Sequence, residues 1–450
     1  MSTALNGNNV SAIILAAGNG TRLKSSTPKV FHKIGGLALV DHVINTVKNI
    51  DIKDSVVVLK PEFRDFQSEV NAEIKKAFQE IPTGTGDTVK FGLEQLTKTD
   101  NGWTFVLYGD IPLITEESLL QMINLAQKNS NTAVVVLAFD SEGTANLGKL
   151  EKADKPGTIK RIVEAKDAKD SDEFIHLCNA GLLIKRDVLN KFLYKIQPSE
   201  ATNEVYITEI VRLAYESGYD CRYYETSREE LSGVNTRAEL ATLEKYFQER
   251  MRNKFLDKGV TLVAPETVFF SHDTEIENDV VIHPYVVFGK NVKISSGAEV
   301  GPFCVVEGAK VGNSDVGPFA RLRPGAEICD GAKIGNFVEI KNSEIHEGAK
   351  VNHLSYIGDS SIGRKTNIGA GTITCNYDGF KKSRTEIGEN VFIGSNSALV
   401  APITIQDGAI IGAGSVITKD VDENSLSVAR GKQVNLQDWA TSFREKRRKK

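Results

Sequence analysis

Apolar residues in the first half of the chain form short continuous runs that alternate with amphipathic segments. Runs of this kind, bounded by turn residues, predict buried β-strands. The clearest are Ala12–Leu15, Val56–Leu59, Phe105–Tyr108 and Ala133–Phe139. Between them, segments such as Glu116–Gln127 show helical spacing, and Thr115 can cap that helix. The alternation from Val10 to about Tyr224 predicts an α/β domain with a mainly parallel sheet, whose ligands bind at the carboxyl ends of the strands.

One long helix is predicted over residues 236–258. Thr236 and Glu239 match a capping box, and Gly259 can end the helix. One face carries Leu240, Leu243, Phe247 and Met251. At 1.5 Å per residue the helix would be about 33 Å long. It is either a connection between two domains or the last helix of the first domain, and the two interpretations are compatible.

After residue 258 the apolar period becomes six. The recurring positions are Ile276, Ile282, Phe288, Ile294, Val300, Val306, Val316, Leu322, Ile328, Ile334, Ile340, Ile387, Ile393, Leu399, Ile405, Ile411 and Ile417. This pattern predicts a hexapeptide β-solenoid whose aliphatic side chains stack inward from coil to coil. Glycine often follows the aliphatic residue, as at Gly335, and we expect it to serve a tight corner.

Three hexapeptides make one triangular coil, which predicts about seven coils and roughly 35 Å of prism. The phase of the repeat slips at several places after Val306. The largest slip, Thr372–Glu386, is polar and predicts a loop that leaves the prism and covers a site on a neighbouring face or chain.

These patterns divide the chain into five segments. They are a disordered extension (1–9), an α/β domain (10–235), a connecting helix (236–258), a β-helix domain (259–438) and a basic tail (439–450). The net charge of −4 argues against nucleic acid as the main partner. No apolar run is long enough to cross a bilayer, and the five scattered cysteines favour a reducing cytoplasm.

The segment Leu15–Arg22 (LAAGNGTR) follows the first strand and can bind phosphate through backbone N–H groups and the guanidinium of Arg22. It lacks the Lys-Ser/Thr of a P-loop and the third glycine of a dinucleotide fingerprint. A plain strand-to-helix turn is the alternative. Lys29, a second cation shortly afterwards, favours the phosphates of a nucleotide.

Asp110 follows the strand Phe105–Tyr108, so it should lie at the carboxyl edge of the sheet. A carboxylate there suits Mg²⁺ that bridges phosphates; the alternative is a capping role for Asp110 before Pro112. Asn235 can be a neutral oxygen ligand, but its position before a helix favours a turn residue.

Among the seven histidines, only His353 stands near candidate chemistry. It lies between two phase slips, with the cations Lys341 and Arg323 one and two coils earlier. A base beside cations can deprotonate an ammonium held next to a phosphate. The alternative is a solvent-exposed histidine. We expect structural roles for His32, His42, His176, His272, His283 and His346.

These motifs together resemble one family from end to end. It comprises the bacterial bifunctional N-acetylglucosamine-1-phosphate uridyltransferases / glucosamine-1-phosphate N-acetyltransferases (GlmU). The matching segments are LAAGNGTR, PKV, PTGTGDT, YGDIPL, IVEAKDA, CNAG, GVNTR, RLRPGAE, GNFVEIK, IGAGTITCNYDG and VFIGS. The first set alone indicates a sugar nucleotidyltransferase, while GNFVEIK, His353 and ITCNYDG are narrower.

The resemblance implies a Rossmann-like uridyltransferase domain that acts on UTP and N-acetylglucosamine-1-phosphate. Arg22 and Lys29 would be catalytic and bind phosphates, while Asp110 and Asn235 would bind Mg²⁺. The other nucleotide and sugar contacts would be Leu15, Ala16, Ala17, Gly18, Gln79, Gly84, Thr85, Tyr108, Gly109, Gly148, Glu164 and Asn179.

For the second domain, the resemblance implies a left-handed β-helix that forms a homotrimer, with acetyltransferase sites shared between chains. His353 would deprotonate glucosamine-1-phosphate for attack on acetyl-CoA, with Glu339 as its orienting partner. The amino-sugar phosphate would be bound by Arg323, Lys341, Tyr356 and Asn367. Acetyl-CoA would contact Ala370, Asn376, Tyr377, Ser395, Ala413 and Arg430.

Two positions depart from the family pattern: Ala165 replaces the usual His, and Ala180 a more usual Thr. Both adjoin the implied sugar pocket. The basic residues after Arg444 are either a solvated end or a closure over a neighbouring chain's CoA site. Rival interpretations of the whole chain are a monofunctional sugar-1-phosphate nucleotidyltransferase with a structural or regulatory β-helix, and a non-catalytic scaffold.

Overall fold

The computed structural model describes residues 9–18, 20–70, 74–140, 148–165 and 174–448. The chain divides into two compact units, Met1–Gln248 and Glu249–Lys450. The expected N-terminal extension, apart from Asn9, lies outside the described residues.

The first unit is built on a mixed sheet. In its described part, the strands follow the order β11-β7-β10-β6-β1-β4-β5, and β8 and β9 pair off this path. Four of the six neighbouring pairs along the path are parallel, and β10 runs antiparallel between β6 and β7. The strands are β1 (Val10–Leu15), β4 (Asp54–Leu59), β5 (Lys75–Phe78), β6 (Trp103–Tyr108), β7 (Thr132–Asp140), β8 (Lys149–Lys152), β9 (Ile159–Val163), β10 (Phe174–Lys185) and β11 (Asp220–Glu225).

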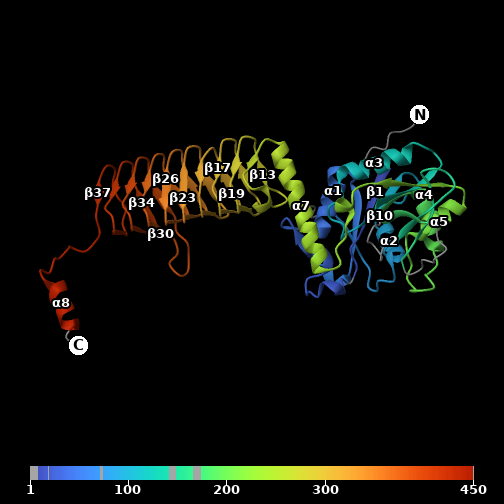
Figure 1. Cartoon of the computed structure of the whole chain (residues 1–450), viewed down its shortest axis with the longest axis horizontal. Coiled ribbons are helices and arrows are strands. Elements are labelled where there is room, and N and C mark those ends of the chain that lie inside the picture. Colours follow the sequence, from blue (N-terminus) through green and yellow to red (C-terminus); the bar gives the residue numbers. More distant parts are fainter. Residues whose placement is uncertain (1–8, 19, 71–73, 141–147, 166–173, 449–450) are drawn as a thin grey trace. The chain divides into compact units, whose positions relative to one another are not determined.

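Helices cover both faces of this sheet (Figure 1). The α-helices are α1 (Leu39–Asn49), α2 (Thr85–Leu93), α3 (Glu116–Gln127), α4 (Arg186–Phe192), α5 (Glu209–Glu216), α6 (Arg228–Leu231) and α7 (Arg237–Asp257). Alternate residues of β1 enter opposite cores: Ala12 and Ile14 join the cluster that contains α1 and α3, while Ile13 and Leu15 join the one with α2, α4 and α5. Burial on both faces explains why the strands read as continuous apolar runs.

The beginning and end of α7 confirm the sequence prediction. Thr236 Oγ1 accepts from the Glu239 N–H at 3.2 Å, and the Glu239 carboxylate accepts from the Thr236 N–H at 2.8 Å. This reciprocal pair satisfies two N–H groups that a helix start leaves free. At the other end, Gly259 adopts φ +89° and donates to the Leu256 carbonyl.

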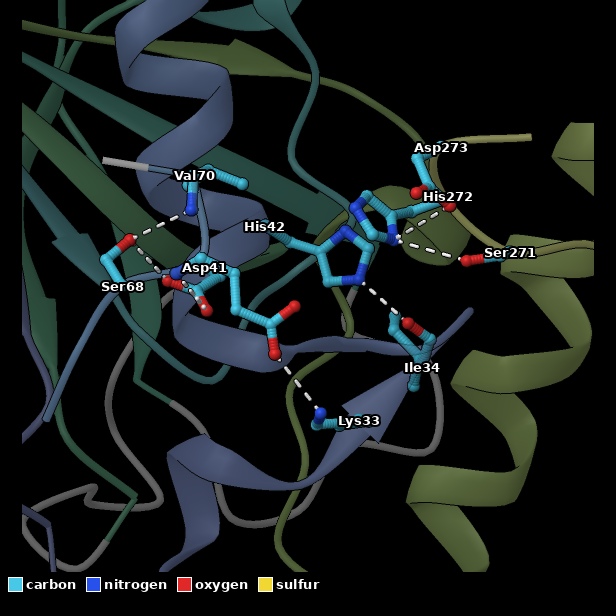
Figure 2. A network of polar contacts seen from close by, with 10 residues as sticks. Lys33, Ile34, Asp41, His42, Ser68, Val70, Ser271, His272 and Asp273 are labelled. Carbon is cyan, nitrogen blue, oxygen red and sulfur yellow. Dashed lines mark hydrogen bonds and ion pairs between the residues drawn. The ribbon is translucent and has the colours of Figure 1, made fainter. Parts of the chain in front are cut away.

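Polar contacts of α1 fix the segment that follows Lys29. The His42 ring bonds to the Ile34 carbonyl at 3.0 Å, and Ser68 Oγ donates to Asp41 at 2.7 Å (Figure 2). The Leu39 N–H also donates to the His32 carbonyl at 2.9 Å. These bonds hold the hairpin of β2 (Lys33–Ile34) and β3 (Leu37–Ala38) against the helix.

The second unit is a left-handed parallel β-helix with three faces, each a sheet of two- to four-residue strands. The β12 face contains β12 (Thr261–Leu262), β14 (Val281–Ile282), β17 (Glu299–Val300), β20 (Asp315–Val316), β23 (Lys333–Asn336), β26 (Lys350–His353), β29 (Asn367–Ile368), β32 (Phe392–Ile393), β35 (Ile410–Ile411) and β37 (Leu426–Ser427). The β13 face contains β13 (Glu275–Ile276), β16 (Lys293–Ile294), β19 (Ala309–Val311), β22 (Ala326–Ile328), β25 (Ser343–Ile345), β28 (Ser360–Ile362), β31 (Thr385–Ile387) and β34 (Ile403–Ile405). The β15 face contains β15 (Val287–Phe288), β18 (Val305–Val306), β21 (Arg321–Leu322), β24 (Glu339–Lys341), β27 (Tyr356–Gly358), β30 (Ile373–Cys375), β33 (Ala398–Val400) and β36 (Val416–Ile417).

The inward stack confirms the six-residue period. All of the recurring aliphatic and aromatic positions are at most 3% exposed. The count of about seven coils is wrong, because two faces have eight strands each and the β12 face has ten over the fully described range 261–427. Leu262, Val268 and Phe270 are buried before the first counted hexapeptide and supply the missing coil.

The corner glycines serve a different purpose from the one predicted. Of those that follow an inward aliphatic, Gly317 has a positive φ of +100°, whereas Gly335 has none in that region. An alanine Cβ at position 335 would lie 1.9 Å from the Asn352 carbonyl oxygen of the next coil. Close approach of successive coils, rather than a left-handed turn, therefore requires glycine there.

Two segments project from the β-helix. Residues 376–384, which we call the arm, leave the prism between β30 and β31 (Figure 1). The arm is shorter than the predicted loop because Thr372–Cys375 and Thr385–Glu386 remain part of the coils. The tail forms an exposed helix, α8 (Trp439–Arg448).

Among the described residues, no helix combines the length and apolarity that a membrane span needs.

We expect Gly335→Ala to destabilise the β-helix by about 1–3 kcal/mol or more, because the added methyl group must displace the backbone of the next coil. Differential scanning calorimetry would show a lower Tm for the transition of this unit. Gly431→Ala is the matched control, since a Cβ there meets nothing within 4 Å. Equal Tm values for the two variants would contradict the close-approach argument.

Candidate functional site

A cavity of about 680 Å³ opens in the first unit at the carboxyl ends of β1 and β6. It draws its lining from segments far apart in the sequence, because Leu15 pairs with Tyr108 where the two parallel strands end. Of the residues predicted from the sequence, the lining includes Arg22, Thr85, Tyr108, Asp110, Gly148, Glu164, Asn179 and Asn235.

A cation bridges the two candidate metal ligands of this cavity. Lys29 Nζ forms an ion pair with the Asp110 carboxylate and donates to Asn235 Oδ1 at 3.1 Å. Arg22 also donates to Asn235 Oδ1, at 2.9 Å. The Val234 N–H donates to the Asp110 carbonyl at 3.1 Å, which ties the two ligand segments together. Two cations and two oxygen ligands therefore converge on one point.

The glycine-rich turn makes room for this cluster. Gly20 has φ +59°, and a Cβ there would lie 2.5 Å from the Cβ of Lys29. Gly18 has open space around it, so its backbone is accessible to a ligand. The turn thus admits both a close-lying lysine and a phosphate group.

The chemistry of these ligands fits Mg²⁺ better than a transition metal. Among the described residues, no group of three or more His, Cys, Asp or Glu side chains is arranged to hold a metal ion. Asp110 and Asn235 offer a carboxylate and an amide oxygen, and both already face a positive charge. Mg²⁺ accepts such a sparse oxygen set because it keeps waters and binds substrate phosphates.

Polar side chains line the opposite part of the cavity. The Asn179 amide donates to the Tyr108 hydroxyl at 3.1 Å, and Thr208 donates to the Glu164 carboxylate at 2.8 Å. Burial and the nearby Glu164 charge raise the pKa of Tyr108. Tyr108 therefore stays a neutral phenol that can donate to a hydroxyl-rich ligand.

Gln79 is a buried amide with an unused donor. It is 0% exposed, its Oε1 accepts from Thr88 at 2.7 Å, and its Nε2 has no partner among the described residues. An unpaired buried N–H carries a free-energy cost that a ligand carbonyl can remove. The exposed segment Glu80–Thr83 follows it directly.

Contacts behind the lining support the cavity at several predicted residues. Ala16 and Ala17 are 2% and 3% exposed, and the Gly109 N–H bonds to the Leu15 carbonyl at 2.9 Å. The Gly84–Thr85 turn packs on residues 205–207, where Thr85 Oγ1 accepts from the Ile207 N–H at 3.0 Å. Ala180 is 1% exposed and belongs to the apolar core, so this departure from the family pattern lies behind the lining.

Sequence reasoning missed several residues of this site, among them Tyr206 and Glu230. Tyr206 lines the cavity, and burial raises its pKa to about 12. Glu230 is buried and accepts from the N–H and the hydroxyl of Thr115 at 2.8 and 2.9 Å. It thereby joins the loop after Asp110 to the segment before Asn235. Neither residue belongs to a recognisable motif, so only the folded structure brings them together.

The predicted acetyl-transfer residues of the second unit form a column along one corner. The Gly371 N–H donates to the His353 carbonyl, the Asn396 N–H to Ala370, and the Gly414 N–H to Ser395. Arg430 continues the column by donating to the Ala413 carbonyl at 2.7 Å. One position in successive coils thus carries His353, Ala370, Ser395 and Ala413 in line.

His353 is oriented by Asn336, not by Glu339 as expected. The two residues pair in register on neighbouring coils, and His353 Nδ1 lies 2.8 Å from Asn336 Oδ1. The Glu339 carboxylate instead accepts from Arg323 at 2.7 Å on the β15 face. Because an amide oxygen accepts from Nδ1–H, the His353 Nε2 lone pair is free to take a proton.

A hollow of about 360 Å³ on the β15 face contains the Glu339 and Tyr356 side chains. It is also lined by Phe319, Phe337 and Leu354 of the adjoining corner. Lys341 follows Glu339 by two positions in β24. Lys382 of the arm lies near Lys341, and the Lys341 amine and its charge lower the pKa of Lys382. Lys382 was not predicted, since its position in a loop gives no sequence signal.

The remaining predicted residues occupy different settings. Asn376 is 8% exposed and bonds to Asp359, while Tyr377 in the arm is 61% exposed. Asn367 is half-buried on the β12 face, where it pairs with Lys350 and Phe392. Asn376 and Tyr377 therefore belong to the arm, and Asn367 belongs to the β12 face.

An α/β unit with a cation-lined cavity and a hexapeptide β-helix with an oriented histidine together define a transferase of two units. Residues 12–192 match the MobA-like NTP transferase domain family, and residues 273–308 and 384–419 match the bacterial transferase hexapeptide (six repeats) family.

Curated relatives extend this match over nearly the whole chain. The bifunctional protein GlmU of Zymomonas mobilis subsp. mobilis is 46% identical and covers 98% of both chains. Those of Paramagnetospirillum magneticum and Wolbachia pipientis wMel are each 44% identical, covering 97% and 94% of this chain and 96% and 97% of their own. The chain belongs to the GlmU family of bifunctional proteins, with a nucleotidyltransferase unit and an acetyltransferase-type hexapeptide unit. The predicted resemblance is confirmed.

We expect Asn336→Ala to lower the kcat of acetyl transfer by about 10-fold or more, since the His353 imidazole would lose the partner that sets its tautomer and orientation. Steady-state kinetics with acetyl-CoA would measure this. His346→Ala is the control, because His346 bonds to Ser361 on the β13 face and should leave the rate unchanged. An unchanged rate for Asn336→Ala would rule out this orienting role.

Proposed function

We propose that the chain makes UDP-N-acetylglucosamine from glucosamine-1-phosphate, acetyl-CoA and UTP. The β-helix would acetylate the amine first, and the α/β unit would then couple the product to UTP and release pyrophosphate. The observation that carries the proposal is the His353–Asn336 pair at the foot of a column of predicted acetyl-CoA contacts. A purely structural prism would need no such pair.

In the α/β unit, Lys29 and Arg22 would hold the phosphates of UTP. The sugar 1-phosphate would attack the α-phosphorus in line, and the two cations would stabilise the charge that develops on the phosphoryl oxygens. Substrate phosphates would attract Lys29 away from Asp110, which frees the carboxylate. No covalent enzyme intermediate is needed.

Asp110 and Asn235 would hold Mg²⁺ between them. A bound ion would supply positive charge that offsets the negative charge of the substrate phosphates. The support for this assignment is that both oxygens already converge on one ammonium group. Glu230 would keep the two ligand segments together through Thr115.

The nucleotide base would be read at Gln79, with Gly84 and Thr85 beside it. The unpaired Gln79 amide supports this role, because a uracil carbonyl would accept from Nε2. Leu15, Ala16, Ala17 and Gly18 would follow the nucleoside along the end of β1. The sugar would lie against Tyr108, Gly109, Gly148, Glu164 and Asn179.

In the β-helix, Arg323, Lys341, Tyr356 and Asn367 would bind glucosamine-1-phosphate. Nε2 of His353 would take a proton from the ammonium, and the free amine would attack the thioester carbonyl directly. The C–S bond would break as the amide forms, and the leaving CoA thiolate would take up the second proton that the nitrogen loses. Lys382 adds a further cation beside Lys341 for the sugar phosphate.

Acetyl-CoA would lie along the corner column. The left-handed positions of this corner hold Tyr285, Phe303, Phe319, Phe337 and Leu354 up to the coil of His353, but Gly371, Asn396 and Gly414 in the coils after it. Small residues leave room for an elongated ligand beside Ala370, Ser395 and Ala413, with Arg430 at the far end. Asn376 and Tyr377 would approach the same ligand from the root of the arm.

The chain would act as a homotrimer assembled through the aromatic corner. Tyr285, Phe303, Phe319 and Phe337 stack at 4.9–5.0 Å and are 45–56% exposed. The β15 face beside them shows Val287 and Val305, also exposed. By contrast, the β13 face presents Glu275, Lys293, Lys310, Glu327, Glu344 and Glu386. Exposed aromatic rows on one edge only are typical of a protein interface.

This enzyme would work in the bacterial cytoplasm. All five cysteines are free thiols in the structure, which suits a reducing compartment. Its substrates are soluble small molecules, and no nucleic acid or membrane partner is implied by the net charge of −4. A monofunctional nucleotidyltransferase, the rival interpretation, would not need the His353–Asn336 pair.

The two activities should separate by mutation. We expect Asp110→Ala to lower uridylyl transfer by about 100-fold or more and leave acetyl transfer intact. His353→Ala should lower acetyl transfer by about 100- to 10,000-fold and leave uridylyl transfer intact. Separate assays with N-acetylglucosamine-1-phosphate plus UTP, and with glucosamine-1-phosphate plus acetyl-CoA, would show this. Loss of both activities in one folded variant would contradict independent sites.

The double variant Tyr285→Asn/Phe303→Asn should weaken the trimer without unfolding the chain. Asparagine tolerates the φ values of +61° and +60° at these positions better than an aromatic residue does, but it removes the apolar surface. Size-exclusion chromatography with light scattering should show a shift toward monomer, and Lys310→Asn on the β13 face should show none. A stable trimer of the double variant would place the interface elsewhere.

A further inference from the structure

Asp359 is a buried carboxylate at the root of the arm. It lies between β27 and β28, is 9% exposed and adopts φ +49°. Its Oδ1 accepts from the Asn342 amide at 2.6 Å, and its Oδ2 accepts from the Asn376 amide. Both carboxylate oxygens are therefore engaged by neighbouring coils.

Asp359 holds both ends of the arm. Asn376, the first arm residue, is bound through its side chain. Thr385, directly after the arm, donates its N–H to the Asp359 carbonyl at 3.1 Å. The Ser383 N–H closes the root by bonding to the Asn376 carbonyl at 2.9 Å. One residue thus fixes the direction in which the arm leaves the prism.

The arm itself is cross-bonded, so its root controls its position. The Asp378 carboxylate accepts from the Phe380 and Lys381 N–H groups at 2.8 Å each. The Tyr377 hydroxyl donates to the Gly379 carbonyl at 2.6 Å. At the tip, Phe380 is 97% exposed. Because these bonds stiffen the arm, we expect it to move mainly as one piece about its attachment to the prism.

The same root touches the amino-sugar phosphate site. The Asp359 N–H donates to the Lys341 carbonyl at 3.0 Å, and the Asn376 amide also reaches the Tyr356 hydroxyl at 3.5 Å. Burial opposes ionisation of Asp359, but the bonds from Asn342 and Asn376 and the charges of Lys341 and Lys382 lower its pKa overall. The negative charge of Asp359 thus offsets the repulsion between the Lys341 and Lys382 ammonium groups.

We propose that Asp359 is a positioning residue for acetyl transfer, which fixes the arm so that Lys382 stays beside Lys341 and the pair can bind the phosphate of the amino sugar. The inference rests on the acetyltransferase part of the proposed function. Asp359 touches no reacting atom. It acts through Asn376, Lys341 and Lys382.

Asp359→Asn tests this, because an amide of the same shape cannot accept from both Asn342 and Asn376 through carboxylate oxygens. We expect the KM for glucosamine-1-phosphate to rise about 10-fold while kcat changes less than about 3-fold. The KM for acetyl-CoA should rise by a smaller factor, because Asn376 and Tyr377 move with the arm. Uridylyl transfer should be unchanged. Trypsin should also cut the arm, at Lys381, Lys382 or Arg384, about 10-fold faster, as measured by mass spectrometry of the arm peptides.

Asp330→Asn is the matched control. Asp330 also accepts an N–H from a neighbouring coil, that of Asn313 at 2.8 Å, but it has no contact with the arm. It should change neither the KM nor arm cleavage. Asn342→Gly is the second variant if Asp359→Asn does not fold: glycine keeps the φ of +45° at position 342 and removes one of the two bonds to Asp359, so it should shift both readouts in the same direction by a smaller factor.

The outcomes separate the two proposals. An unchanged KM together with unchanged arm cleavage in the Asp359 variant, or in Asn342→Gly if that alone folds, would overturn the positioning role. A fall in kcat at constant KM, with a lower Tm, would also overturn it and show a structural role. Absence of acetyl transfer in the unmodified protein would instead defeat the proposed function, while faster arm cleavage would still support Asp359 as the root of the arm.

Discussion

The hydrogen-bond register between parallel strands is the constraint on which both units depend. In the α/β unit it aligns the ends of β1 and β6, so that a glycine-rich turn and a Tyr-Gly-Asp segment nearly 90 residues later share one cavity. In the β-helix it repeats coil by coil and places His353 in line with Ala370, Ser395 and Ala413. In both cases residues that are distant in sequence lie close together, because the backbone pairing fixes the position of each strand relative to its neighbours.

The two sites also use charge in the same way. In each, cations gather where a phosphate would bind, and a carboxylate with amide partners keeps them close together: Asp110 with Asn235 around Lys29, and Asp359 with Asn376 near Lys341 and Lys382. Such compensation lets a chain with a net charge of −4 hold several cationic side chains close together.

Patterns that repeat or cap locally were predictable from the sequence. The inward stack of the β-helix, the Thr236–Glu239 capping box and the helix Glu116–Gln127 depend on neighbours a few residues away. The partner of His353 was not predictable by the same means. It lies 17 residues earlier, and the phase slips hide which residues of adjacent coils face one another. Lys382 was missed because loop packing has no period. Glu230, in the short helix α6, was missed because its partner Thr115 lies 115 residues earlier.

The arm has a consequence for how such a protein can change over evolutionary time. It is inserted at a corner between β30 and β31, and both strands pair with neighbouring coils through residues outside the arm. A corner loop can therefore lengthen, shorten or exchange its side chains while the buried core of the prism stays intact. New substrate preferences can arise at such a corner without a new fold.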